Sequence, residues 1–530
     1  MNVDASSLPE NAADLKAIVI SLAASHAGLQ EKEQTYQSRI EYLEERIRLL
    51  QNELFGRKTE KLPVEDRDQL LLFNEVEIEK EARDNDVSDE VIIAAHSRRK
   101  RGRKPLPQDL PRVEVIHDLT EDEKVCACGN HLSRIGEEVC EKLDIIPARV
   151  RVLRHIRYKY ACKKCEGVES DGPTVKIAAA PVELIPKSIA TSGLLAHLLV
   201  AKFEDALPFY RQEKIFARMG VELSRATMCN WAVKVAERIK PLMELLHQEI
   251  RSGPLINIDE TPVQVLREPG RSNTSKSYMW VYRGGDPQKP VLIYQYQPSR
   301  SGQVPFAFLK GYQGFVQTDG YGGYDLLGRQ VGIRMVGCWA HVRRKFLEVI
   351  KAKSNPKKKG HAENALDYIG RLYAIEKQAT ANELSNDQLY CLRQNAAKPM
   401  LNDFKSWLTR MSTLTPPKGL LGKAVNYTLH NWDRLARYIE DARLRPDNNL
   451  AENAIRPFVL GRKNWLFSGH PNGAEASAVI FSLIETAKAN GLKPYEYFRF
   501  LFEKLPHAES EEDYKKLLPR HIDPGLLIVS

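Results

Sequence analysis

The sequence lacks any long apolar run, and its cysteines are few for its length. The longest apolar stretches, such as residues 194–201, fall far short of the roughly 18 residues that a membrane-spanning helix requires. Eight cysteines in 530 residues are too sparse for a disulfide scaffold, and no segment resembling a secretion signal precedes them. These absences favour a cytoplasmic protein in a reducing compartment, with no membrane partner.

The chain is long enough for several domains, and its positive charge is clustered. At about 150 residues per domain, the length predicts roughly three or four domains, and 43% hydrophobic residues suffice to fill their cores. Basic residues gather at 97–105, 341–346 and 351–360. This clustering, more than the formal net charge of +9, predicts a polyanionic partner.

Three acidic residues stand out because of where they fall. Asp259 lies inside the apolar run 255–265, which reads as a buried strand. An ionised carboxylate in such a place usually hydrogen-bonds, pairs with a cation or ligates a metal. Asp319 follows 60 residues later, where a second apolar run meets a glycine-rich turn, and Glu452 follows 133 residues after that, in a polar segment that begins like a helix. Together they form an Asp, Asp, Glu set.

Residues 29–54 contain an apolar seam with heptad spacing. From Tyr36 to Leu54 the apolar residues recur at alternating intervals of four and three. This period predicts a coiled coil and therefore a homo-oligomer. An amphipathic helix that packs on its own protein is the alternative. The helix should end near 55–62, where Gly56 breaks the pattern.

Residues 64–110 change from acidic to basic without sustained periodicity, which is typical of a linker. Within it, Arg101 and Arg103 flank a glycine, and a proline follows. An extended strip of this kind can lie in a narrow AT-rich minor groove. A solvated charge run that contacts phosphates without sequence preference is the alternative.

Two pairs of cysteines predict a metal module. Cys126 and Cys128 form the first pair, and Cys162 and Cys165 form the second. Four thiolates in two pairs suit one tetrahedral structural Zn²⁺ in a small ribbon. The tight first pair leaves open whether His131 replaces one cysteine, and free cysteines without metal are the alternative. The cysteines that are isolated in sequence should pack in the core; they are Cys140, Cys229, Cys338 and Cys391.

The pattern turns helical between residues 187 and 250, and residues 212–239 have the parts of a helix-turn-helix. Gly220 supplies the turn, and Ser224 can cap the helix that follows. The side chains expected near the exposed N-terminal end of that helix are Arg225, Thr227 and Asn230. Such side chains meet base edges or phosphates in a recognition helix. A helix pair that serves only packing is the alternative.

The next region reads as α/β. Strand signals stand at residues 255–261, 277–284, 290–297, 313–319 and 333–341. With helices near 303–310 and from Val342, this order is that of a ribonuclease-H-like fold. In that fold the first and fourth strands are neighbours, which would place Asp259 beside Asp319. Residues 345–445 are mostly helical and suggest an all-α insertion before the segment with Glu452.

In several of these segments, the chain resembles a DDE transposase of the insertion sequence 66 family. The segments that carry the resemblance are FGRKTEK, KRGRKPLPQDLPR, the cysteine module, LPFYRQEKIF, NIDET, TDGYGGYD and NNLAENAIRPFVLGRKNWLF. It implies movement of a mobile element, with Asp259, Asp319 and Glu452 as the catalytic carboxylates. The family's usual first knuckle is CxxC, whereas this chain has CAC at 126–128. Cys338-Trp-Ala-His341 is similar to the C-x-x-H signature of several DDE groups; packing of both side chains in the core is the alternative.

Phosphodiester transfer explains why carboxylates are needed. In-line attack on phosphorus develops charge on the attacking and leaving oxygens, which two Mg²⁺ ions, or Mn²⁺ in their place, can stabilise. Carboxylates are the hard oxygen ligands that such ions prefer. We expect Asp259 to bridge the two ions, Asp319 to hold one and Glu452 to hold the other. Water would first cleave a strand at the element end, and the freed 3′-hydroxyl would then attack target DNA.

Basic and aromatic residues follow Glu452. Arg456 lies one helical turn further on, where it can meet a phosphate or pair with Glu452. Pro457 should end or kink that helix. The residues beyond it that combine charge with a stacking surface for a frayed base are Arg462, Lys463 and Trp465.

The predicted architecture is a ribonuclease-H-like α/β catalytic core with an all-α insertion, preceded by a coiled-coil helix, a small zinc-ribbon-like module and a helical DNA-binding region. The expected boundaries are 1–62 for the coiled-coil helix, 63–112 for the linker, 113–180 for the zinc module, 181–250 for the helix-turn-helix region, 251–347 and 446–490 for the two parts of the catalytic domain, 348–445 for the insertion and 491–530 for the C-terminal segment.

The predicted partner is double-stranded DNA, at element ends and at the target, in the bacterial cytoplasm at the nucleoid. A role for accessory proteins of the same element stays open. Two other functions compete: a DDE nuclease that does not join DNA, and an inactive DNA-binding regulator. The regulator predicts loss of an acid, but all three are present. A nuclease would not need the coiled coil, the zinc module and the helix-turn-helix.

Overall fold

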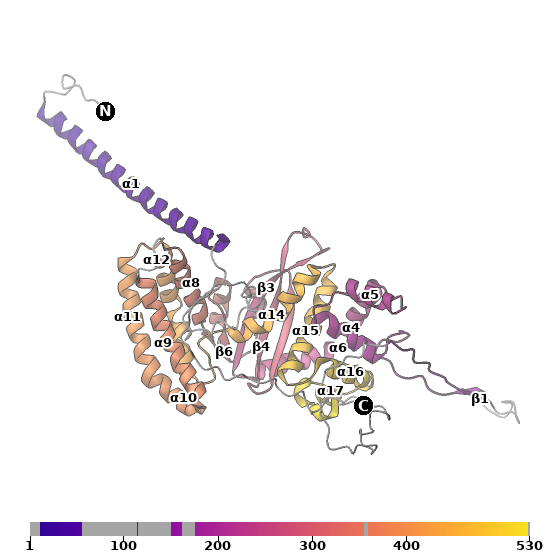
Figure 1. Cartoon of the computed structure of the whole chain (residues 1–530). Helices are drawn as coiled ribbons and strands as arrows, with labels where there is room; N and C mark the ends of the chain where they lie inside the picture. Colours follow the sequence, from indigo (N-terminus) through magenta and orange to yellow (C-terminus); the bar gives the residue numbers. More distant parts are fainter. Residues whose placement is uncertain (1–10, 56–113, 115–149, 162–174, 354–358, 528–530) are drawn as a thin grey trace, which may run out of the picture. The chain divides into compact units, whose positions relative to one another are not determined.

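The fold is described from a computed structural model, whose described residues are 11–55, 114, 150–161, 175–353 and 359–527 (Figure 1). The sequence predictions that lie outside these residues are the linker arginines, the zinc ligands with their alternative, and one isolated cysteine: Arg101, Arg103, Cys126, Cys128, Cys162, Cys165, His131 and Cys140. Within the described ranges, no helix combines the length and the apolar character that crossing a membrane requires.

The N-terminal helix α1 spans Ala12–Phe55 and ends one residue before Gly56, as the sequence predicts. The apolar seam of α1 includes Tyr36, Ile40, Leu43, Ile47 and Leu50. They keep between 42% and 67% of their surface open to solvent. The apolar seam is therefore uncovered within a single chain.

The opposite side of α1 contacts its own chain. Leu49 is 1% exposed, and a carboxylate oxygen of Glu45 accepts a hydrogen bond from the Leu420 N–H at 3.1 Å. The Arg48 Nε donates to the Ala352 carbonyl at 3.0 Å. At 3.6 residues per turn, Glu45 and Leu49 lie about half a turn away from the seam. α1 therefore packs on its own chain through a side other than the seam, and a coiled coil between copies stays a prediction.

A small ribbon and three helices precede the main sheet. Their bounds are β1 Lys159–Ala161, β2 Val175–Ile177, α4 Ser192–Phe203, α5 Phe209–Arg218 and α6 Arg225–Ser252. Gly220 joins α5 to α6 with φ 79°, a left-handed conformation that favours glycine. Ser224 caps α6, because its hydroxyl accepts the Thr227 N–H at 3.2 Å. The predicted helix, turn and cap are all present.

The main sheet is mixed. Its strands are β3 Leu255–Val265, β4 Lys276–Gly285, β5 Pro290–Gln297, β6 Gly314–Gln317, β7 Ile333–Val336 and β8 Phe467–Ser468. The order is β5-β4-β3-β6-β7, with β8 paired to the end of β3. β3, β4 and β5 form an antiparallel meander, while β6 runs parallel to β3 and β7 parallel to β6. β3 and β6 are neighbours, as the order of strands predicts.

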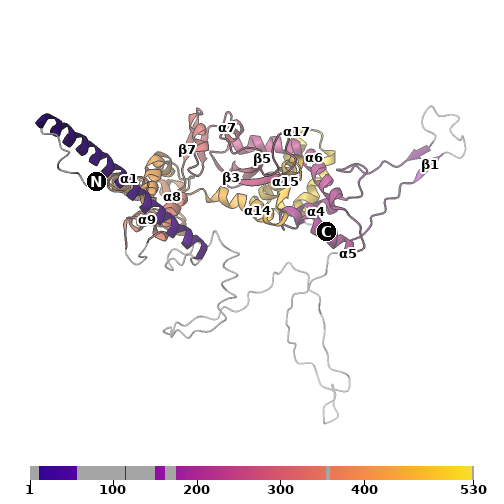
Figure 2. The same ribbon diagram turned by 90° about the horizontal axis from the view of Figure 1, so that it is seen from above.

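Helices cover both faces of this sheet. The elements on or around it are α7 Gln303–Phe308, η3 Gly322–Arg329, α14 Asn449–Trp465, α15 Pro471–Ala489, α16 Pro494–Lys504, η6 Leu505–His507, α17 Glu511–Lys516, η7 Pro519–His521 and η8 Pro524–Leu527. α14 packs on β3 and α15 on β5. Seen from above, α14 and α7 lie on opposite sides of the sheet (Figure 2). Phe308 of α7 stacks on Tyr282 of β4 with ring centroids 3.6 Å apart.

A second hydrophobic core is helical. Its helices are α8 Trp339–Lys351, α9 His361–Ala381, α10 Asn386–Leu392, η4 Arg393–Ala397, α11 Lys398–Leu414, α12 Leu420–His430, α13 Trp432–Ala436 and η5 Arg437–Glu440. Trp339 is fully buried there and lies 5.9 Å, between ring centroids, from both Phe404 and Trp432. Phe315 of β6 and Val336 of β7 join this core to the sheet.

Two expectations about local structure are wrong, and of the two effects expected of Pro457, an end or a kink of its helix, the first does not occur. The strand expected at 333–341 ends at Val336, and α8 begins at Trp339, so the C-x-x-H segment enters a helix. Cys338 is buried as expected, but Cys229 and Cys391 are exposed. Cys391 lies on α10, which buries none of its side chains, and Cys229 faces away from its buried neighbours Met228 and Trp231. α14 continues through Pro457 to Trp465 and does not end there.

Candidate active site

Strands β3 and β6 bring the two aspartates to one edge of the sheet. Asn257 of β3 pairs in register with Gln317 of β6. Because side chains alternate along a strand, Asp259 projects from the same face as that pair. Asp319 follows two residues after β6 ends, and its carboxylate raises the pKa of both Asp259 and Glu452. The Asp259 carboxylate accepts the Glu260 N–H, and the Asp319 carboxylate accepts the Tyr321 N–H, both at 2.9 Å.

A glycine allows the helical core to approach this edge. Gly320 follows Asp319, and a Cβ at that position would overlap the hydroxyl of Tyr427 on α12. The chain can therefore turn sharply beside Asp319 while α12 packs against it. The glycine-rich turn predicted from the sequence has this steric reason at Gly320.

Helix α14 brings the third acid. Glu452 lies in its first turn, and α14 packs across β3 and β4. On the antiparallel side of β3, Asp259 is in register with Val281, which is in register with Tyr294 of β5. Tyr294 contacts Phe481 of α15, so α14 and α15 cover the face from which Asp259 projects. Segments 133 residues apart in sequence thus meet at one site.

Like charges gather there. Burial raises the pKa of Asp259 well above its usual range, and the carboxylates of Glu260, Glu452 and Asp319 raise it further. Burial also raises the pKa of Glu452, while Arg344 opposes that rise. The Arg344 guanidinium lies 3.9 Å from a Glu452 oxygen. Three carboxylates in a partly buried cluster create strong attraction for a cation.

Helix α8 adds an imidazole to the cluster. The Nδ1 of His341 lies 3.7 Å from Oε1 of Glu452, too far for a hydrogen bond. Both atoms are buried and lack a hydrogen-bond partner. Burial and the neighbouring Arg344 lower the pKa of His341, so the ring is neutral at pH 7. The Arg344 guanidinium lies 3.3 Å from Nε2 of the same ring. Because arginine can only donate, the proton of the neutral ring lies on Nδ1, and a cation bound between Nδ1 and Glu452 would have to displace that proton.

Cys338 lies in the same cluster but is already engaged. Ligand atoms of Cys338, His341 and Glu452 all fall within 4.8 Å of one another. Burial raises the pKa of the Cys338 thiol to about 12, and its sulfur accepts the Asn448 N–H at 3.2 Å. A protonated, hydrogen-bonded thiol is a poor ligand. The set that fits a divalent cation is therefore the carboxylates together with His341.

The other residues predicted on α14 lie at different depths. Arg462 reaches β3, where its guanidinium donates to the Thr261 hydroxyl at 3.2 Å, two residues beyond Asp259 on the same face. Arg456 is close enough to Glu452 to lower its pKa. Lys463 is exposed. Trp465 is half-buried, with its ring against Phe203, Phe458 and Phe481.

The residues predicted on the helix-turn-helix belong to another part of the surface. Arg225 and Asn230 are exposed and Thr227 is half-buried at the start of α6. The Arg225 N–H also donates to Glu213 of α5 at 3.0 Å, which fixes the turn. α6 packs on β4, β5 and α15. No described contact joins these side chains to the acids.

Sequence reasoning passed over Glu260, the acid next to Asp259. It projects from the opposite face of β3, where Arg300 pairs with it at 2.6 Å and the Tyr324 hydroxyl donates to it. Arg300 also lies over the Tyr321 ring, 3.8 Å from its centroid. Although it projects from the other face, Glu260 raises the pKa of Asp259, and Asp319 raises the pKa of Glu260. The ion pair with Arg300 explains how this additional buried acid is tolerated.

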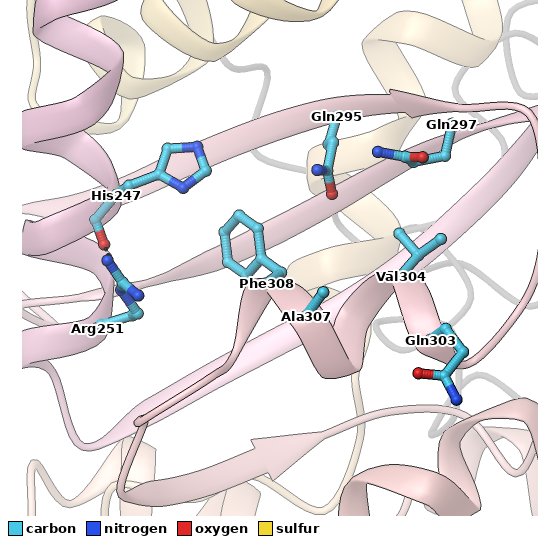
Figure 3. Close-up of a pocket in the computed structure, with 8 residues that line it drawn as sticks. All are labelled: His247, Arg251, Gln295, Gln297, Gln303, Val304, Ala307 and Phe308. Atoms are coloured by element: carbon cyan, nitrogen blue, oxygen red, sulfur yellow. Dashed lines mark hydrogen bonds between the residues drawn. The ribbon is translucent and has the colours of Figure 1, made fainter.

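A polar pocket of about 480 Å³ opens elsewhere (Figure 3). Its lining residues are His247, Arg251, Gln295, Gln297, Gln303, Val304, Ala307 and Phe308. Gln295 is in register with Trp280, which is in register with Glu260. The pocket therefore opens on the face of the sheet opposite Asp259 and is separate from the acid cluster.

Comparison with known families covers most of the chain. Residues 187–476 match the profile described as transposase IS66 family, and residues 123–166 match a zinc-finger binding domain of transposase IS66. Residues 42–115 match the profile described as transposase C of IS166 homeodomain, and residues 482–519 match the IS66 C-terminal element. The first match alone spans more than half of the sequence.

Curated relatives come from Sinorhizobium fredii. The uncharacterized protein y4jD is 35% identical over 76% of this chain and 78% of its own length. The uncharacterized protein y4qI is 28% identical and covers 98% of both chains. The uncharacterized protein y4hP is 30% identical over 85% of this chain and 83% of its own length. The similarity therefore extends over nearly the whole chain.

Proposed function

Because the chain belongs to the IS66 transposase family, we propose that it binds the ends of a mobile DNA element and catalyses metal-dependent strand cleavage and strand transfer. One observation supports this most directly. Asp259, Asp319 and Glu452 come from two strands and a distant helix, yet they share one edge of the sheet, where His341 and Glu452 present orphaned ligand atoms.

We further propose that the mixed sheet is a ribonuclease-H-like catalytic domain and that the second, helical core is an insertion within it. The strand order β5-β4-β3-β6-β7, with an antiparallel meander followed by parallel strands, supports this. The helical core lies in sequence between β7 and α14. If the helical core were removed, the strands and the three acids would still belong to one site.

The carboxylates of Asp259, Asp319 and Glu452 would hold two Mg²⁺ ions, or Mn²⁺. Such ions supply charge stabilisation at the phosphodiester and a lowered pKa for the attacking oxygen. In the first reaction a water oxygen bonds to phosphorus and the 3′-oxygen of the element end leaves. In the second, that 3′-hydroxyl bonds to a target phosphorus and displaces another 3′-oxygen. Neither reaction needs a covalent bond to the protein.

Side chains around the acids would position DNA. Arg462 and Arg456 lie on the helix that carries Glu452 and can meet phosphates on either side of the scissile bond. Exposed Lys463 extends this basic surface. Trp465 offers only part of its ring to a frayed base, because three phenylalanines cover the rest.

Other parts of the chain would recognise the element end. The residues proposed for this are Arg101 and Arg103 in the linker and Arg225, Thr227 and Asn230 on α6. A structural Zn²⁺ on Cys126, Cys128, Cys162 and Cys165 would order the module between them, consistent with the zinc-finger match. The exposed seam of α1 would join two copies. Since the proposed substrate is chromosomal DNA, we place the protein at the bacterial nucleoid.

Strand cleavage and transfer on a labelled duplex from the ends of its own element test the proposal. Asp259→Asn, Asp319→Asn and Glu452→Gln should each bind this duplex in a gel shift but neither nick nor join it. Asp325→Asn is the matched control, because Asp325 is half-exposed and pairs with Arg434 at 2.7 Å, away from the acids. Ca²⁺ in place of Mg²⁺ should preserve binding and suppress cleavage.

Wild-type rates in Glu452→Gln would show that the third acid has been misassigned. Cleavage without joining by the wild-type protein would favour a nuclease. Binding without either reaction would favour a regulator.

A further inference from the structure

Three buried amide side chains connect the segments that carry the acids. Asn257 lies on β3, Gln317 on β6 and Asn448 immediately before α14, and each is at most 1% exposed. The Asn257 amide donates to Gln317 at 3.1 Å and to Asn448 at 3.0 Å. Asn448 in turn donates to the Ile258 carbonyl of β3 at 2.8 Å. The three residues form one continuous network beneath the site.

The network also includes the start of α8. The Gln317 amide donates to the Gly337 carbonyl at 3.1 Å and to the Arg445 carbonyl at 2.8 Å. The backbone N–H of Asn448 donates to the Cys338 sulfur. Residues 445–448 are thus bonded to β3, to β6 and to the entry of the helix that carries His341.

Each of the three amide residues precedes one of the acids by two or four positions in the sequence. Asn257 and Gln317 precede Asp259 and Asp319 by two residues, one full pleat of their strands. The Asn448 carbonyl accepts the Glu452 N–H at 3.2 Å, one helical turn away. A shift of any amide would therefore shift the acid that follows it.

We propose that Asn448, held by Asn257 and Gln317, is the positioning residue that sets Glu452 against the two aspartates. This rests on the proposed function and deepens it. Residue 448 must donate to Ile258 and accept from Asn257 at once, and an amide does both in a single side chain. Glu452 arrives from a separate hydrophobic core, so its register on β3 depends on bonds such as these. Asn448 is 1% exposed, so its proposed role is to act through Glu452 and not on a cation or on DNA directly.

Asn448→Ala tests the assignment against a matched control, Thr486→Val. Thr486 is also 1% exposed, and its hydroxyl bonds both the N–H and the carbonyl of Leu292 at 3.0 Å, on edge strand β5. Both changes remove buried hydrogen bonds between a helical segment and the sheet, but only Asn448 is linked to the acids. A loss of general stability would affect both variants alike.

We expect Asn448→Ala to lower the cleavage rate by about 100-fold, since a misplacement of about 1 Å can cost that much. Binding of the end duplex should be unchanged, and the Mg²⁺ concentration for half-maximal rate should rise. Thr486→Val should cleave at close to the wild-type rate. Equal losses in the two variants, or a normal rate in Asn448→Ala, would overturn the assignment.

Mn²⁺ binding, followed by calorimetry without DNA, separates this inference from the function itself. Asn448→Ala should weaken Mn²⁺ binding by about 10-fold, as loss of a group that orients metal ligands does, and Thr486→Val should not. If the wild type binds Mn²⁺ but never cleaves, the proposed function fails while the positioning role is still decided by this titration. Unaltered Mn²⁺ affinity in Asn448→Ala would refute the positioning role.

Discussion

Replacing Lys202 with Met should stabilise the protein at neutral pH. Lys202 lies in the last turn of α4, and burial lowers its pKa from 10.5 to about 8. That difference means that folding with Lys202 protonated costs about 3 kcal/mol. Methionine keeps an unbranched stem of similar length and removes the charge.

Aromatic rings offset part of this penalty. The Lys202 Nζ lies 4.6 Å from the Trp465 ring centroid, 4.7 Å from that of Phe209 and 5.3 Å from that of Phe203. Together such cation–π contacts contribute about 1–2 kcal/mol at a largely desolvated site. Burial therefore wins, and Lys202→Met should raise the free energy of unfolding by roughly 1–2 kcal/mol at pH 7.

The sign of the pH dependence follows from the lowered pKa. Below pH 8 the lysine is protonated in both the folded and the unfolded protein, so folding bears the full cost of burying the charged ammonium. Between about 8 and 10.5 the unfolded chain binds the proton and the folded one does not, so the stability of the wild type rises with pH. The advantage of Lys202→Met should accordingly shrink from pH 7 to pH 10.

Urea unfolding at both pH values measures this difference. Lys234→Met is the control, because Lys234 is exposed on α6 and its replacement should change stability by less than about 0.5 kcal/mol. A destabilised Lys202→Met variant would show that the rings outweigh burial. An advantage that does not depend on pH would show that it arises from packing and not from the charge.

Two further predictions concern assembly and the metal module. Freshly purified protein should contain about one zinc per chain outside the catalytic site, and Cys162→Ser should release it; protein free of zinc would contradict the assignment of the four cysteines. Ile47→Lys places a charge at the centre of the exposed seam of α1 and should lower the mass seen by light scattering without unfolding the catalytic unit. An unchanged mass would mean that the seam does not join copies.

The strand positions were predictable because their signal is local. The apolar run around Asp259 and the run ending before Asp319 are both buried strands. Their adjacency was predicted from the likeness of the element order to a ribonuclease-H-like fold, in which the first and fourth strands are neighbours. The start of α8 was misplaced because residues 335–340 (MVGCWA) form one run without a charged side chain, and such a run cannot by itself distinguish a strand from the start of a buried helix.

The partners of the acids were harder to predict. Asn257 and Gln317 carry a sequence signal, since each is a polar residue in an apolar strand two positions before an aspartate. Asn448 carries none, because a polar residue before a helix usually reads as an ordinary cap. Its buried amide contacts residues about 190 positions away, and no local pattern encodes contacts of that range. The exposure of Cys229 depends likewise on which side of α6 meets the core.

The distance in sequence between Asp319 and Glu452 has a consequence for the order of synthesis. At about 5–20 residues per second, the 133 residues between them take roughly 7–27 s to translate. During that interval β3 and β6 have already emerged with both aspartates, but the third acid does not yet exist. For the proposed chemistry, a nascent chain is therefore harmless to nearby DNA until the helical core has been made and α14 can reach back to β3.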